Sequence, residues 1–111
     1  MRVAVLGVDD PAFLEELSQR TDVSLRRRAR CDLLFVGFDG REGLARLGAH
    51  KDFIAPDGAL WAIWPKGSKA INENDVRDAA LAIGLVDVKV VAFSPTHSAL
   101  KLVIPLAHRP H

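Results

Sequence analysis

One apolar run, residues 59–64, constrains the fold of this chain more than any other stretch. It lies in the segment GALWAIWPKGSK (58–69), which becomes polar abruptly after Pro65. A run of this length without a charged side chain is typical of a strand that is covered on both faces, as strands in parallel sheets are. We therefore predict a buried strand in the middle of a parallel sheet, followed by a polar loop at residues 65–69.

The size and charge of the chain limit its class. Its 111 residues suffice for one compact domain, and 49% of them are hydrophobic, as in ordinary globular proteins. A net charge of +1 supplies no overall field to attract nucleic acid or an anionic membrane. The single cysteine, Cys31, excludes an internal disulfide and fits a reducing compartment. No apolar run reaches the roughly 20 residues that span a bilayer, so we expect a cytoplasmic protein with no membrane partner, and the small net charge disfavours nucleic acid as a partner.

Strand-type and helix-type periodicities alternate along the chain. The apolar patterns predict strands at residues 2–8, 23–30, 31–38, 59–64, 86–93 and 98–106. Helical spacing predicts three helices, at residues 11–21, around Leu44 and Leu47, and at residues 72–84. Strands joined by helices imply right-handed crossovers and a mostly parallel sheet, whereas the last two strands, joined by residues 94–97, form an antiparallel hairpin. We predict a three-layer α/β domain (residues 1–106) with six strands in the order 2-1-3-4-6-5, and a frayed tail (residues 107–111).

Several residues mark the ends of these elements. Asp9 or Asp10 can cap the first helix, and Asn72 can cap the last. Gly84 is the stop signal of the last helix. We predict that the middle helix breaks at Gly48 or His50, and that residues 56–58 form a turn into the central strand.

The predicted strand 23–30 is polar and belongs at a sheet edge. Arg26, Arg28 and Arg30 alternate along it, and edge arginines discourage pairing with another molecule. With Arg20, the same arginines form an alternative, a local patch for nucleic acid or an acidic partner. Because the aromatic residues that stack on bases are absent among them, the guarded edge is the favoured interpretation.

The predicted plan resembles the class I S-adenosylmethionine (SAM)-dependent methyltransferase fold with its middle removed, since that fold also ends in a helix and a reversed hairpin. A closer resemblance, to an uncharacterised bacterial family of small methyltransferase-like (Rossmann-like) domains of unknown function, is carried by DGALWAIWPK (57–66), DVR (75–77), GLVDVK (84–89) and SALK (98–101). At His97 and Ala99 the chain departs from this family, where an aromatic residue and a glycine are expected. The resemblance implies a truncated methyltransferase-like fold and no established activity.

Methyl transfer makes two demands that the sequence does not meet. In that fold, SAM needs a glycine-rich turn after the first strand and an acidic residue at the end of the second, as dinucleotides do in related folds. The first turn, LGVDDP (6–11), holds one glycine, and residues 28–30 at the end of the second strand are basic. We therefore predict a protein that is not an enzyme, with no cofactor and no catalytic residues.

A ligand site is nevertheless expected outside the carboxyl ends of the strands, where open α/β sheets bind ligands. The candidate residues at these ends are Asp9, Asp39, Arg41, Lys66, Gly67, Ser68 and Lys69. Lys66 and Lys69, near a helix N-terminus, can hold a phosphate or a carboxylate. The alternative is that residues 65–69 are a solvated crossover loop. Asp9 and Asp10 are candidates for a general base or for metal ligands, although a helix cap also requires such a residue.

Other chemistry-bearing residues do not form a recognisable site. His50, His97, His108 and His111 lack the spacing of a metal site. Cys31 begins an apolar strand, where a buried thiol is expected. Trp61 and Trp64 are three positions apart, so in a strand they point to opposite faces and suit packing under helices on both sides.

Together these patterns predict a non-catalytic, methyltransferase-like binding or interaction domain. Self-association, or a protein partner, would use the apolar face of the last hairpin. The alternative is a protein that binds a small anion or a phosphorylated metabolite with the loop 65–69. The sequence leaves the biological process, the partner and the oligomeric state open.

Overall fold

One six-stranded sheet, in the order β2-β1-β3-β4-β6-β5, forms the middle of the molecule. It is seen in a computed structural model, which describes residues 2–26 and 30–105. The strands are β1 (Val3–Leu6), β2 (Val23–Ser24), β3 (Cys31–Gly37), β4 (Ile54–Pro65), β5 (Val86–Ala92) and β6 (His97–Val103). Strands β1 to β4 are mutually parallel where they pair, and β6 runs antiparallel to both of its neighbours, β4 and β5. The predicted order and the closing hairpin are confirmed.

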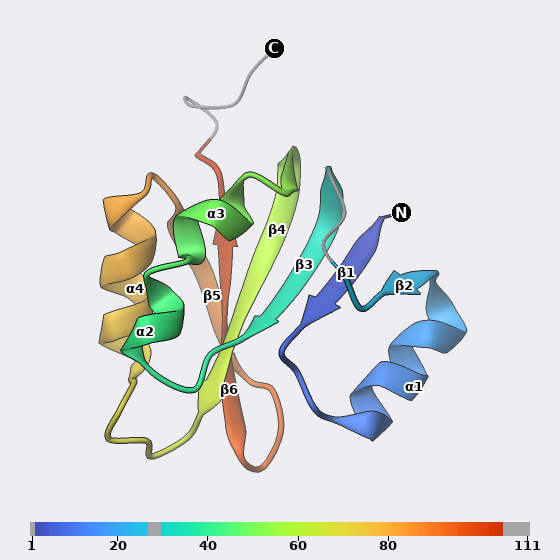
Figure 1. Ribbon diagram of the computed structural model, residues 1–111, viewed down its shortest axis with the longest axis horizontal. Coiled ribbons are helices and arrows are strands. Elements are labelled where there is room, and N and C mark those ends of the chain that lie inside the picture. The colour runs from blue at the N-terminus through green and yellow to red at the C-terminus, as the bar shows by residue number, and fades with distance from the viewer. Residues whose placement is uncertain (1, 27–29, 106–111) are drawn as a thin grey trace.

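The helices lie on both sides of this sheet. They are α1 (Pro11–Arg20), α2 (Arg41–Leu44), α3 (Leu47–Lys51) and α4 (Glu73–Ala82). Figure 1 shows α2, α3 and α4 together on one side of the molecule and α1 beside β2 on the other. Within the described residues, no helix is long and apolar enough to cross a membrane.

The main core lies between the sheet and the helices α2 to α4. Leu60 and Ala62 of β4, with Leu100 and Leu102 of β6, belong to one core cluster with Val76 and Ala80 of α4. Trp64 belongs to this core and is only 4% exposed. Trp61 lies half-buried on the opposite face, stacked on Phe35 with ring centroids 6.5 Å apart. The prediction that the two tryptophans point to opposite faces is therefore confirmed.

The face that carries α1 is more thinly covered. Phe13 of α1 meets Phe35 and Phe93 edge to face, with centroid distances of 5.1 and 4.7 Å. No residue of α1 is fully buried. This helix therefore adds much less to the core than α4 does.

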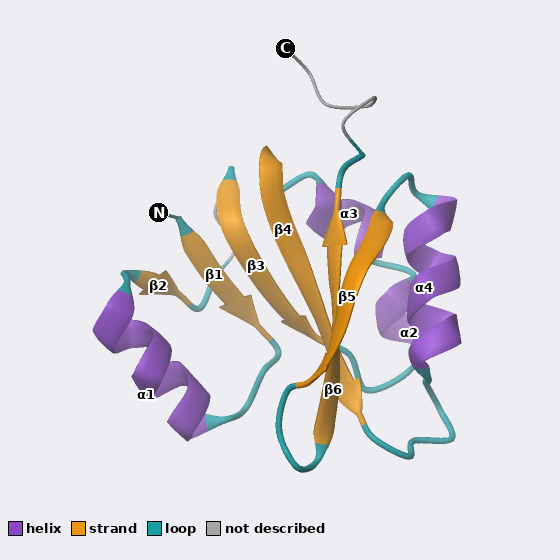
Figure 2. Ribbon diagram, turned by 180° about the vertical axis from the view of Figure 1, so that it is seen from behind, coloured by secondary structure: helices purple, strands orange, loops and turns teal. Residues whose placement is uncertain are grey.

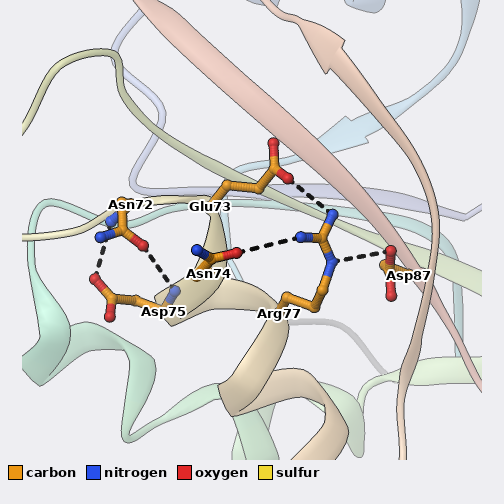
Figure 3. Close-up of polar contacts among 6 residues, drawn as sticks. All are labelled: Asn72, Glu73, Asn74, Asp75, Arg77 and Asp87. Carbon is orange, nitrogen blue, oxygen red and sulfur yellow. Dashed lines mark hydrogen bonds and ion pairs between the residues drawn. The ribbon is translucent and has the colours of Figure 1, made fainter.

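Polar caps fix where the longer helices begin. Asp10, rather than Asp9, caps α1, because its Oδ1 accepts a hydrogen bond from the backbone N–H of Phe13 at 3.1 Å. Asn72 and Asp75 form a reciprocal capping box at α4, in which each side chain accepts from the other residue's backbone N–H at 3.0 Å (Figure 3). Such a box satisfies two N–H groups that the first turn leaves unpaired. Gly84, at a φ of +83°, ends α4 as predicted.

Arg77 joins α4 to the edge strand β5. Its guanidinium contacts Glu73 at 2.9 Å and donates from Nε to Asp87 at 3.1 Å (Figure 3). The hydrogen bonds to Glu73 and then to Asp87 raise the pKa of Arg77. This cluster connects α4 and β5 through Arg77 and Asp87, which are ten residues apart in sequence.

The predicted turn at residues 56–58 is wrong, because these residues lie inside β4. The pairing of β3 with β4 shifts register between Cys31 and Leu33, so the stretch forms an irregularity within a long strand. A Cβ on Gly58 would lie 2.6 Å from the carbonyl oxygen of Cys31, so the close approach of β3 requires a glycine. Proline and glycine mark bulges as well as turns, and here the bulge prevails.

The predicted strand 23–30 is shorter than expected. In the part of this stretch that the structure describes, only Val23 and Ser24 pair with β1, although the strand does lie at the sheet edge as predicted. The Ser24 hydroxyl donates to the carbonyl of Arg26 at 2.9 Å and accepts from its N–H at 3.1 Å. Such a local loop competes with strand pairing, which explains the early end. Arg28 lies outside the described residues, as do His108, His111 and the predicted tail 107–111.

Two short helices replace the single middle helix that was predicted. α2 ends at Leu44, and α3 continues through Gly48 and His50 to Lys51, so neither residue breaks a helix. The interruption occurs at Ala45 and Arg46, after Gly43. A Cβ on Gly43 would lie 3.1 Å from the Phe38 ring, so tight packing favours glycine there, and glycine weakens a helix.

Candidate ligand-binding site

A crevice of about 90 Å³ lies at the carboxyl ends of β1, β3 and β4. Asp9 and Asp10 line it from the segment after β1, and Asp39 lines it from the segment after β3. The opposite wall includes Phe93, Thr96 and His97, from the β5–β6 connection. Figure 2 shows this connection curving beside the carboxyl ends of β1 and β3. We call this hollow the acidic crevice.

Two glycines bring the walls of the acidic crevice together. Gly7 has a φ of +69°, and a Cβ on Gly37 would overlap its carbonyl oxygen. The backbones at the ends of β1 and β3 therefore touch, which only residues without a side chain permit. The N–H of Phe38 donates to the carbonyl of Ile63 at 2.8 Å and so extends the contact to β4. The aspartates that follow β1 and β3 therefore lie at the same edge of the sheet.

The charge of the acidic crevice favours a cation. Among the described residues, its lining holds three aspartates and no lysine or arginine. A small hollow lined by one sign of charge concentrates ions of the opposite sign. Asp10 already accepts the capping hydrogen bond of α1, so Asp9 and Asp39 are the carboxylates left for a ligand. Among residues 2–26 and 30–105, no group of three histidine, cysteine or acidic side chains is arranged to hold a metal ion.

A second, wider hollow adjoins the acidic crevice. Its lining shares Gly37, Phe38 and Asp39 with the crevice and adds Arg41 and Arg46, and its volume is about 580 Å³. Nε of Arg41, the first residue of α2, lies 3.4 Å from a carboxylate oxygen of Asp75. This ion pair fixes the position of the Arg41 side chain. Small-molecule sites typically have volumes of about 300–1,000 Å³. We call the two hollows together the strand-end groove.

The strand-end groove contains three of the predicted site residues and not the other four. Asp9, Asp39 and Arg41 lie along it. Residues 66–69 follow β4 and line neither hollow. Their loop is tied back locally, since the Ser68 hydroxyl accepts from the N–H of Ala70 at 3.1 Å and the N–H of Lys66 donates to the carbonyl of Thr96 at 2.9 Å.

The sequence analysis missed the contribution of the hairpin. Because β6 is antiparallel to β4, its first residue, His97, pairs with Pro65 at the carboxyl end of β4. The predicted hairpin could have revealed this position. A strand that runs antiparallel to its neighbours begins at the edge where those strands end, so the loop before it lies at that edge. Arg46 was missed as well, because its position follows from the break between α2 and α3.

Solved structures of low sequence identity share this fold. Magnesium protoporphyrin IX methyltransferase from Synechocystis PCC 6803, solved with bound SAM, is 12% identical over 95% of this chain and 70% of that one, with a TM-score of 0.64. The fibrillarin pre-rRNA processing protein of Methanococcus jannaschii is 12% identical over 93% of this chain and 66% of that one (TM-score 0.62). A TehB-like SAM-dependent methyltransferase from Corynebacterium glutamicum is 12% identical over 94% of this chain and 68% of that one (TM-score 0.56). No family model and no curated protein sequence matches the chain.

These comparisons establish a methyltransferase-like fold and correct one prediction. The absence of a glycine-rich turn led us to expect a protein that is not an enzyme. Two of these structures are named as methyltransferases, one solved with bound SAM and one described as SAM-dependent, and methyltransferases are enzymes, so that expectation is overturned. One missing turn is therefore no ground for excluding catalysis in this fold.

Proposed function

We propose that this protein is an S-adenosylmethionine-binding enzyme of the methyltransferase type, with the cofactor in the strand-end groove. The observation that carries the proposal is the meeting of Asp9 and Asp39 at the carboxyl ends of β1 and β3. A methyltransferase with bound SAM has the same fold. In open α/β sheets, this edge is where ligands lie.

The charges of the groove fit the methionine end of SAM. That end carries a sulfonium and an ammonium group close to a carboxylate. Asp9 and Asp39 in the acidic crevice suit the two cations, and Arg41 and Arg46 in the neighbouring hollow suit the carboxylate. When bound, SAM supplies an electrophilic methyl group.

The nucleoside end of SAM would be held by other means than the usual acidic residue. β2 ends at Ser24, and Leu25 and Arg26 follow, so no carboxylate stands there for the ribose hydroxyls. The wider hollow has the volume for the adenosine part. Most of the affinity is therefore expected to come from the charged end.

Isothermal titration calorimetry with SAM and with S-adenosylhomocysteine (SAH) tests the proposal. We expect Asp39→Asn to weaken SAM binding about tenfold or more, because hydrogen bonds to a charged group contribute about 1.5–3 kcal/mol. Asp57→Asn is the matched control, since Asp57 is exposed on β4 and lines neither hollow. No heat of binding with either compound at millimolar concentration, or equal loss in both variants, would refute the proposal.

Three narrower statements are also proposals. Membership of the uncharacterised bacterial family rests on the four matching segments between residues 57 and 101. A cytoplasmic location is supported by the presence of a single, buried cysteine, because one cysteine cannot form an internal disulfide. Binding of a small anion or a phosphorylated metabolite by the loop 65–69 is supported by the exposed side chains of Lys66 and Lys69. A thermal shift with inorganic phosphate that disappears in a Lys66→Ala/Lys69→Ala variant would support anion binding, and no shift in the parent protein would refute it.

We further propose that the protein associates with itself or with a protein partner through the last hairpin. Val88 and Val90 on β5 are 58% and 49% exposed, so apolar side chains face the solvent at the sheet edge. Light scattering after size exclusion tests self-association. A concentration-dependent mass that Val90→Lys abolishes would support it, whereas a monomer at every concentration would exclude it.

A further inference from the structure

We propose that His97 accepts the proton that a methyl acceptor loses in the strand-end groove. This inference rests on the proposed function and names a substrate class, a molecule that reacts through a hydroxyl or an amine. His97 lines the acidic crevice, and no other histidine within residues 2–26 and 30–105 does so. Among the side chains, imidazole exchanges a proton most readily near neutral pH.

A chain of hydroxyl groups orients the imidazole ring. Nδ1 of His97 lies 2.8 Å from the Thr96 hydroxyl, which lies 3.2 Å from the hydroxyl of Ser94. The Ser94 hydroxyl also accepts from the backbone N–H groups of Thr96 and His97, at 3.2 and 3.1 Å. With Nδ1–H donating to Thr96, the lone pair of Nε2 is available to a substrate. Thr96 and Ser94 are thus positioning residues.

The charged side chains around His97 are mainly acidic. Asp9, Asp10 and Asp39 line the same crevice. Lys66 directly follows Pro65, the β4 residue that pairs with His97, and its side chain is exposed. Its charge is therefore screened by solvent more than the crevice carboxylates are.

The proton and electron balance is simple. Bound SAM would supply the methyl group, and transfer of that group to the acceptor atom would leave the electron pair of the broken carbon–sulfur bond on sulfur. The proton of the acceptor's hydroxyl or amine moves to Nε2 of His97. The imidazolium then releases that proton to water.

Histidine NMR of ¹⁵N-labelled protein tests this assignment without a known substrate. SAM and SAH have nearly the same shape, but only SAM carries the positive sulfonium. If His97 faces the transferable methyl group, its proton affinity should be about tenfold lower in the SAM complex than in the SAH complex. The His97→Gln variant identifies the His97 resonance.

The outcomes separate this inference from the proposed function. Binding of both ligands with the same His97 titration in each would overturn the role of His97 and leave SAM binding standing. Binding of neither ligand would overturn the proposed function and this inference together. A second measurement, on Thr96→Val, should show a shift away from the Nδ1–H tautomer, and an unchanged tautomer would refute the positioning role of Thr96.

Discussion

The carbonyl oxygen of Gly7 occupies the space where a side chain on Gly37 would begin. Any larger residue at position 37 must push β1 and β3 apart at the floor of the acidic crevice. We expect Gly37→Ala to lower the free energy of unfolding by about 1–3 kcal/mol, which is typical of forced overpacking. Urea denaturation measures this change.

Gly48→Ala is the matched control for this substitution. Its Cβ would lie 3.6 Å from a methyl group of Ile83, an ordinary contact, and Gly48 lies within α3. Replacing a helical glycine with alanine typically stabilises by up to about 1 kcal/mol. Equal destabilisation by both substitutions would contradict the special closeness of Gly7 and Gly37.

The capping box of α4 gives a second prediction. Asn72→Ala removes the acceptor for the N–H of Asp75 and should cost about 1 kcal/mol of unfolding free energy. Asn72→Ser keeps an oxygen acceptor and should cost much less. Thermal denaturation of the two variants checks the order, and a serine variant as unstable as the alanine variant would argue against the cap.

The Arg77 cluster gives a prediction with a pH dependence. We expect Arg77→Gln to lower the melting temperature more than Arg20→Gln. Arg77 pairs with both Glu73 and Asp87, whereas Arg20, among the described residues, pairs with Glu16 alone on the exposed surface of α1. Because the pKa of Arg77 is raised in the folded state, its contribution is complete at all pH values below the unfolded pKa of arginine. The contribution is lost only as the pH rises through the folded value. The difference in melting temperature between Arg77→Gln and the parent protein should therefore not decline between pH 7 and pH 10, and a decline would contradict the assigned cause.

The helix-covered core gives a prediction of larger size. Leu102 of β6 is fully buried between the sheet and α4, so Leu102→Ala should cost about 2–5 kcal/mol. Leu81 of α4 is 54% exposed, and Leu81→Ala should change the stability by at most about 0.5 kcal/mol. Chemical denaturation measures the free energy of unfolding of both variants. Similar decreases in the two variants would contradict the burial assigned to Leu102 and Leu81.

Hydrophobic periodicity predicted most of the fold. The buried run 59–64 identified β4, and the residues 86–106 with their single break identified the hairpin, so the strand order could be derived. Asp10 and Asn72 were recognisable as caps because few residue types can accept a hydrogen bond there. The bulge at Gly58 was not recognisable, since a proline and a glycine in sequence signal a turn and a bulge equally well.

The candidate site was predictable in part, for a geometric reason. Asp9, Asp39 and Arg41 follow parallel strands, and parallel strands end at one edge, so their meeting follows from topology alone. Residues 66–69 also follow a parallel strand, but the path of a loop after its strand depends on local contacts such as that between Lys66 and Thr96. Sequence periodicity carries no information on such contacts.

The fluorescence of the two tryptophans reports separately on the two faces of the sheet. Trp64 lies in the core beneath α4, and Trp61 lies on the opposite face against Phe35. The chain contains no tyrosine, so emission excited near 295 nm comes from these two indoles alone. A pair of single-tryptophan variants, Trp61→Phe and Trp64→Phe, would therefore reveal whether the two sides of the sheet come apart together or one after the other.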